Sequence, residues 1–157
     1  MARRFYTLFF YLCLPIIFVR LFLRSRQAPQ YRLRWGERLG FVRNAPKPQG
    51  LWVHAVSVGE TLAAVPLIKR IQAEYPDLPI TITTMTPTGS EQVRRNFSDS
   101  VFHLYIPYDL PGAVRRLLDK IKPKVLLVME TELWPNLIDQ CRRRDIPVVI
   151  ANARLSE

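Results

Sequence analysis

The chain has 157 residues, enough for about one domain and an appendage, and its 23 Lys and Arg outnumber 13 Asp and Glu. Residues 1–50 hold ten of the basic residues and one acid, whereas residues 51–157 are nearly balanced, with 13 basic and 12 acidic residues. A nucleic-acid-binding domain would carry its basic residues on the folded part, so this distribution argues against nucleic acid and favours an anionic membrane surface as a partner.

The N-terminal segment is expected to be a membrane anchor, residues 1–23. Residues 5–19 carry no charge, Arg20 follows, and three further apolar residues come next. A bilayer span needs about 20 apolar residues, so this segment could cross the membrane or lie in its interface. No small-residue cleavage site follows, which argues against a cleaved signal peptide. The arginines that come next predict that the following domain lies on the cytoplasmic face of an inner membrane.

Residues 24–50 are basic and irregular, and they interleave arginines with Tyr31 and Trp35. Such a composition suits a linker at the level of the lipid headgroups, although an ordinary solvated linker would look the same. The Pro-rich stretch 46–50 marks the boundary of the domain that follows.

Residues 51–157 alternate between strand and helix patterns, which predicts an α/β fold: a Rossmann-like parallel sheet with helices on both faces. In the first helix, Leu62, Val65, Ile68 and Ile71 have the spacing of a buried face, but Pro66 conflicts with it. That helix therefore either begins near Ala63 or is kinked. The strands are expected at residues 51–55, 80–84, 101–106, 125–129 and 147–151.

Polar residues gather where these strands end, the edge at which open α/β sheets bind ligands. Glu60 and Glu130 follow two different strands, so one carboxylate could act as a general base while the other orients a hydroxyl group. Glu60 could equally be a first-turn acid that stabilises its helix. The turn before residue 91 could hold a phosphate or a sugar hydroxyl, or be no more than a helix cap. The edge residues are Ser57, Gly59, Glu60, Thr86, Thr88, Gly89, Asp109, Glu130, Glu132, Asn152 and Arg154.

Several familiar sites are missing from the sequence. It contains no phosphate-binding lysine loop, no dinucleotide fingerprint, no nucleophile elbow and no zinc-protease motif. Cys13 and Cys141 have neither metal-ligand nor redox spacing, and His54 and His103 stand alone in expected strands. We therefore expect no metal and no cofactor.

Four motifs resemble one family, the 3-deoxy-D-manno-octulosonic acid (Kdo) transferases. They are HAVSVGE at 54–60, TTMTPTGS at 83–90, METELWPN at 129–136 and NARLS at 152–156, in the family's order. The basic, apolar N-terminus resembles the membrane anchor of that family, and the resemblance covers essentially the whole chain.

The resemblance implies an inverting glycosyltransferase of the GT-B type, which transfers Kdo from CMP-Kdo to the lipid A precursor (lipid IVA) in lipopolysaccharide synthesis without a metal. Glu60 matches the general base, and Glu130 matches a residue that stabilises the transition state. Ser57, Gly59, Thr86, Thr88, Gly89, Glu132 and Arg154 are then expected to bind substrate. The chain stops where the family's acceptor domain stops, so we expect the CMP-Kdo-binding C-terminal domain to be absent and the chain alone to be inactive.

Two other interpretations stay open at this point. A membrane-anchored binding domain without enzymatic activity would use Glu60 only as a helix cap. A nucleic-acid-binding protein would fit the overall charge, but the near-neutral residues 51–157 argue against it.

Overall fold

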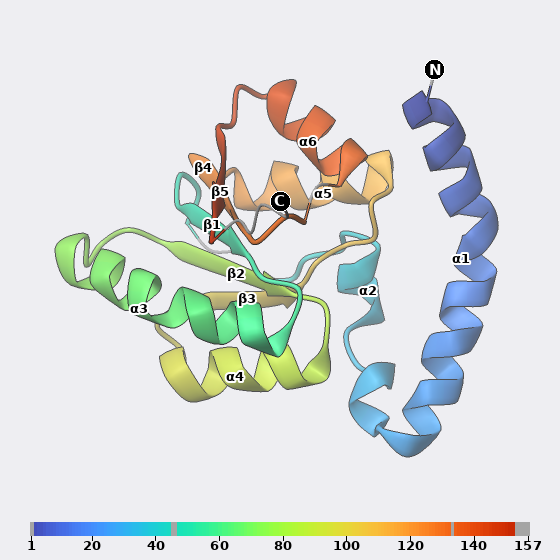
Figure 1. Cartoon of the computed structure of the whole chain (residues 1–157), viewed down its shortest axis with the longest axis horizontal. Coiled ribbons are helices and arrows are strands. Elements are labelled where there is room, and N and C mark those ends of the chain that lie inside the picture. Colours follow the sequence, from blue (N-terminus) through green and yellow to red (C-terminus); the bar gives the residue numbers. More distant parts are fainter. Residues whose placement is uncertain (1, 45–46, 133, 153–157) are drawn as a thin grey trace, which may run out of the picture.

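The computed structural model describes residues 2–44, 47–132 and 134–152 and contains a five-stranded parallel sheet (Figure 1). The strand order is β3-β2-β1-β4-β5. The strands are β1 (Leu51–His54), β2 (Ile80–Thr84), β3 (Phe102–Tyr105), β4 (Val125–Met129) and β5 (Val148–Ala151). The helices are α1 (Ala2–Gln27), the short 3-10 helix η1 (Pro29–Arg32), α2 (Trp35–Arg38), α3 (Val58–Glu74), α4 (Pro87–Phe97), α5 (Pro111–Ile121) and α6 (Pro135–Arg142).

Two helix layers cover the two faces of the sheet, as the sequence predicts. Successive side chains of a strand point to opposite faces, so Val53 packs with α3 and α4 while its neighbour Trp52 packs with α5 and α6. On β4, Leu127 likewise packs with α3 and α4, and its neighbour Leu126 packs with α5 and α6. Figure 1 shows α3 and α4 on one side of the strands and α5 and α6 on the other. The Rossmann-like fold class is confirmed.

Helix α3 begins at Val58, so the alternative in which it starts near Ala63 is wrong. Pro66 lies inside the helix on its exposed side, where the carbonyl group that loses its backbone partner faces solvent. Of the expected buried face, Val65, Ile68 and Ile71 pack against the core, whereas Leu62 is exposed. Glu60, Thr61 and Ala64 are also buried.

The segment between α1 and β1 is more ordered than the irregular linker we expected. Within it, the carboxylate of Glu37 accepts a hydrogen bond from the backbone N–H of Tyr105 on the edge strand β3 (2.7 Å). Gly40 has a φ of +80° and lies against the backbone of Ala113, where a Cβ atom would collide with the carbonyl oxygen. These contacts fix α2 to the sheet and to α5. The division into an anchor (1–23), a linker (24–50) and a domain (51–157) stays a prediction.

Helix α1 lies along the domain instead of projecting from it (Figure 1). One side of the helix packs on Tyr108, Leu110 and Ala113, which follow β3. Polar contacts hold its N-terminal end to α6, because Arg3 pairs with Asp139 and Thr7 hydrogen-bonds with the side chain of Asn136 (3.0 Å). The inward apolar residues of α1 are Phe10, Leu14, Ile17, Phe18 and Leu21.

The two histidines of the chain are strand residues of the fold's interior. His54, at the end of β1, is fully buried and hydrogen-bonds with the Thr83 hydroxyl (3.0 Å), and burial lowers its pKa to about 4. His103 on β3 contacts the Thr84 hydroxyl through Nε2 (3.0 Å). Burial, assisted by the charges of Arg34 and Arg94, lowers the pKa of His103 to about 3.

These low pKa values predict acid sensitivity between pH 7 and pH 5. Unfolded histidines, with a pKa near 6.5, take up protons in this range while the folded ones stay neutral, so stability falls as the pH falls. We expect the free energy of unfolding to fall by roughly 2 kcal/mol for each histidine, measured by urea denaturation at both pH values. The variant His103→Gln should lose about half of this pH dependence. Equal stability at pH 7 and pH 5 would contradict the prediction.

Candidate active site at the carboxyl edge of the sheet

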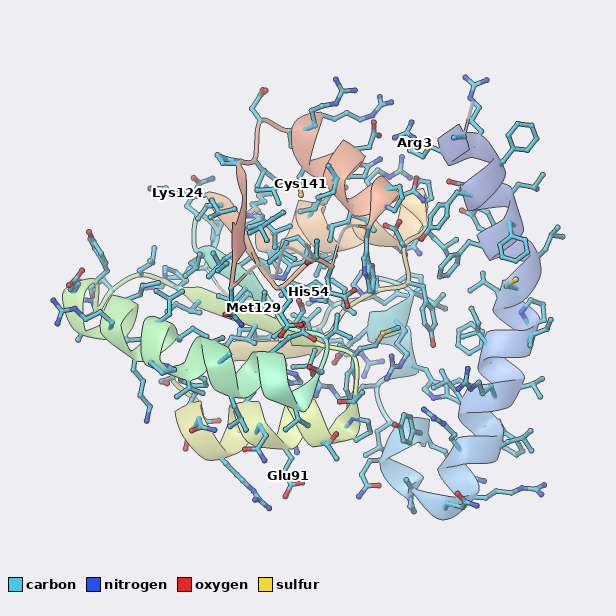
Figure 2. The ribbon with its side chains drawn as sticks, in the orientation of Figure 1. Arg3, His54, Glu91, Lys124, Met129 and Cys141 are labelled. Atoms are coloured by element: carbon cyan, nitrogen blue, oxygen red, sulfur yellow. The ribbon has the colours of Figure 1, made fainter. Side chains whose placement is uncertain are left out.

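The topology of the sheet places a switch point between β1 and β4. The chain leaves β1 for α3 on one face and leaves β4 for α6 on the other, so the two departing turns separate, which is the arrangement at which open α/β sheets bind ligands. His54 and Met129, the last residues of these two strands, lie near the middle of the molecule in Figure 2. The turns that carry Glu60 and Glu130 therefore flank the position at which such folds bind ligands.

Glu60 is held in place by the backbone of its own turn. Its Oε2 accepts a hydrogen bond from the N–H of Val56 (2.8 Å) and its Oε1 accepts one from the N–H of Ser57 (3.1 Å). In return the Ser57 hydroxyl accepts from the N–H of Glu60 (3.2 Å), which completes a capping box. The residue is only 4% exposed. The first-turn cap that the sequence left open is thus observed, and it orients the carboxylate rigidly.

Glu130 sits at a strained position directly after β4. Its φ is +57°, a region that few residues other than glycine adopt, and its N–H donates to the carbonyl of Ala151 at the end of β5 (2.8 Å). Asn152, which follows β5, also has a positive φ of 56°. Two residues on, the carboxylate of Glu132 accepts a hydrogen bond from the Trp134 indole (3.1 Å), and that ring packs edge-on against His54. Strained backbone of this kind is common at functional sites.

The turn between β2 and α4 has the geometry of a helix cap. Thr86 is the N-cap residue, and its hydroxyl accepts a hydrogen bond from the N–H of Gly89 (3.1 Å). Thr88 is exposed, with its hydroxyl 3.2 Å from that of Thr86. A Cβ atom on Gly89 would lie 3.2 Å from the Thr86 hydroxyl and 3.3 Å from the Cβ of Thr84, so a larger residue would have to push α4 slightly away from β2. The cap leaves the Thr88 hydroxyl on the surface beside the site.

The structure assigns Asp109 a different role from its neighbours at this edge. Its carboxylate accepts hydrogen bonds from the backbone N–H groups of Asn136 (2.9 Å) and Leu137 (2.8 Å), so it caps α6 from 27 residues away. Burial raises the pKa of this carboxyl group, and the hydrogen bonds oppose the increase. Sequence position alone could not distinguish such a remote cap from a site residue. Arg154 lies outside the described residues.

Nothing in the described ranges resembles a metal centre or a reactive thiol. Residues 2–44, 47–132 and 134–152 contain no group of three His, Cys, Asp or Glu side chains placed to share a metal ion. Cys141 lies on the buried side of α6, and burial raises the pKa of its thiol to about 11.

The fold is a Rossmann-like domain of the glycosyltransferase N-terminal class, and it carries carboxylates at the edge where open α/β sheets bind ligands. Residues 33–157 match the family model described as 3-deoxy-D-manno-octulosonic-acid transferase (kdotransferase). The chain therefore belongs to the Kdo transferase family, as its motifs predict.

Named relatives agree with the family model. The chain is 54% identical to the 3-deoxy-D-manno-octulosonic acid transferase of Haemophilus influenzae over 99% of its own length, and 37% identical to that of Bordetella pertussis over 99%. It is 32% identical to the enzyme of that name from Chlamydophila psittaci over 91% of its length. The chain spans 37%, 38% and 33% of the lengths of these three proteins.

The two glycines of the site should respond differently to alanine. A Cβ on Gly59 would meet only the Ser57 hydroxyl, at 3.9 Å, so Gly59→Ala should raise the free energy of unfolding by up to about 1 kcal/mol through helix propensity. Gly89→Ala should lower it by about 1 kcal/mol because the new methyl group overpacks against β2. Urea denaturation of both variants makes the comparison. A loss of stability in Gly59→Ala would show that this glycine has a role in the backbone.

Proposed function

We propose that this chain is the acceptor-binding half of an inverting transferase, which moves Kdo from CMP-Kdo to the lipid A precursor (lipid IVA). The observation that carries the proposal is the position of Glu60 and Glu130 on either side of the β1–β4 switch point, in a chain of the Kdo transferase family. A second, donor-binding domain is expected to supply CMP-Kdo. These 157 residues alone would then bind the acceptor without transferring sugar.

In the proposed reaction, an acceptor hydroxyl oxygen attacks the anomeric carbon of Kdo from the face opposite the leaving group. Glu60 takes the proton of that hydroxyl, the new carbon–oxygen bond forms with inversion, and CMP departs with the electron pair of the bond that breaks. Glu130 stabilises the charge that develops in the transition state. Ser57, Gly59, Thr86, Thr88, Gly89, Glu132 and Arg154 are proposed to position the substrate. No metal and no cofactor takes part.

The surroundings of Glu60 support a role as base. A carboxylate has about four lone-pair positions, and the two backbone N–H groups occupy two of them, which leaves acceptor capacity for a substrate hydroxyl. The capping box fixes the position of the carboxylate before substrate arrives, so little ordering is needed when the substrate binds.

The same hydrogen bonds favour a second candidate, a membrane-anchored binding domain without catalysis. Both carboxylate oxygens of Glu60 already have backbone partners, which is sufficient reason for an acid at this position. The two functions predict different effects of removing the Glu60 carboxylate: a general base is required for turnover, whereas a helix cap is not.

A chimaera tests the base assignment. Residues 1–157 replace the corresponding part of the Haemophilus influenzae relative, and Kdo transfer is measured for Glu60→Gln and for the control Glu74→Gln on the exposed end of α3. General base catalysis is worth about 10²- to 10⁴-fold, so Glu60→Gln should lower kcat by at least about 10² with little change in KM. Urea denaturation of both variants reports the cost of the altered cap. A Glu60→Gln variant with unchanged kcat would favour the binding domain.

We further propose that α1 lies in the cytoplasmic interface of the inner membrane instead of crossing it. The 26-residue helix is long and apolar enough to span a bilayer, but its N-terminal end is tied to α6 and its inward side to the loop after β3. A spanning helix would have to give up these contacts. The opposite side exposes apolar residues that suit lipid: Phe5, Leu8, Phe9, Leu12, Ile16 and Val19.

The orientation can be tested with an affinity tag placed before residue 1. In membrane vesicles with the cytoplasmic side outward, added protease should remove this tag, because an interfacial α1 keeps both of its ends on one side of the membrane. A tag after residue 157 serves as the control for access. Protection of the N-terminal tag alone, seen by immunoblot, would mean that α1 crosses the bilayer.

A further inference from the structure

A pocket of about 300 Å³ opens between α1 and the loops that follow β2 and β3. It lies beside the candidate active site but shares none of the carboxylates there. Among the residues that the structure describes, its lining combines arginines with apolar side chains and contains no acidic residue. The lining residues that matter are Arg20, Arg24, Arg38, Phe10, Ile17 and Leu21.

Arg38 is the feature of the pocket that most needs an explanation. The residue is only 2% exposed, and its Nε has no hydrogen-bond partner among the described residues. One Nη donates to the carbonyl of Met85 (3.0 Å), and the guanidinium lies over the ring of Tyr105 (4.5 Å). Within the described part of the chain no carboxylate pairs with it. A buried cation without an anion is costly, so the site is built for an anion that is supplied from outside.

Two further arginines, both on α1, line the same pocket. Arg20 and Arg24 lie one helical turn apart, and Arg24 is placed over the ring of Tyr31 (5.7 Å). Guanidinium groups bind phosphate through paired N–H donors, and several of them around one pocket match a doubly charged phosphate monoester.

The other wall of the pocket suits a hydrocarbon chain. Phe10, Ile17 and Leu21 belong to the inward side of α1, and the outward side of the same helix is exposed and apolar. A ligand that is anionic at one end and apolar at the other can therefore meet both parts of the lining at once, with its apolar part continuing toward lipid.

Backbone contacts connect this pocket to the site of Glu60. Met85 and Thr86 line the pocket, and the N–H of Met85 donates to the carbonyl of Val56 (3.4 Å). The N–H of Val56 in turn donates to the carboxylate of Glu60. A phosphate held at the arginines thus sits next to the turns that form the candidate active site.

From these contacts we propose that the pocket binds a phosphate group of the acylated acceptor lipid, with the phosphate at Arg20, Arg24 and Arg38 and an acyl chain along α1. The assignment rests on the proposed acceptor function, and it adds the part of the acceptor that the domain recognises. A phosphate at the pocket directs the sugar hydroxyls toward Glu60.

The test is a binding titration of the full chain in a neutral detergent. Its probes are the phosphorylated lipid A precursor, the same lipid after phosphatase treatment, and glycerol phosphate, which has no acyl chain. The variant Arg20→Gln/Arg24→Gln is compared with Arg26→Gln/Arg43→Gln, which removes the same charge at exposed positions outside the pocket lining. Arg38→Gln provides a second test of the same pocket.

The pocket variant should lose at least about tenfold in affinity for the phosphorylated lipid and nothing for the dephosphorylated one, while the control binds both like the wild type. Glycerol phosphate should compete only weakly. Equal losses of affinity in the pocket and control variants would overturn the proposal, because they would show a general attraction between basic residues and an anionic lipid. Strong competition by glycerol phosphate would show that an acyl chain along α1 does not contribute to binding.

The two proposals fail in different ways. If the pocket variant binds the phosphorylated lipid normally and the chimaera still depends on Glu60 for turnover, the pocket assignment is wrong and the acceptor function stands. A wild-type chain that binds neither form of the lipid would contradict the acceptor function itself.

Discussion

The parallel pairing of β1 with both β2 and β4 is the constraint on which the rest of the structure depends. In register, Val53 lies between Ile82 and Leu127, so a central strand is covered on both edges and both faces. Because the chain returns from the edge strand β3 to form β4 beside β1, the turns after β1 and β4 become neighbours that lead to opposite faces. Glu60 and Glu130 follow two neighbouring strands for this reason.

Local hydrogen bonds then prepare this edge of the sheet. The capping box of α3, the hydroxyl cap of α4 and the remote Asp109 cap of α6 each satisfy backbone N–H groups that a helix leaves without partners. Those caps hold the first turns of three helices in fixed positions at the carboxyl edge of the sheet. The same residues thus stabilise the fold and shape the proposed site, so a carboxylate such as Glu60 can serve both.

Helix α1 lies between an exposed apolar surface of its own and the loops beside this site. Its inward side packs on residues that follow β3, and its arginines share a pocket with the buried Arg38. The positive charge of the N-terminal region, which first indicated an anionic surface, is therefore also concentrated at one place beside the active edge. Under the proposed function, a lipid acceptor that reaches the protein along α1 would meet these arginines before it meets the carboxylates.

The sequence by itself determined the alternation of strands and helices after residue 50 and the Rossmann-like class, because apolar periodicity and turn residues are local and can be recognised in the chain. The family came from a different source, the resemblance of four motifs to those of the Kdo transferases. The sequence also singled out Glu60 and Glu130 from the ends of two strands. Only the tertiary structure decided that Asp109 caps a distant helix, that Leu62 faces outward, that α1 folds back on the domain and that Arg38 is buried. Each of these depends on contacts between residues far apart in the chain, which no local pattern encodes.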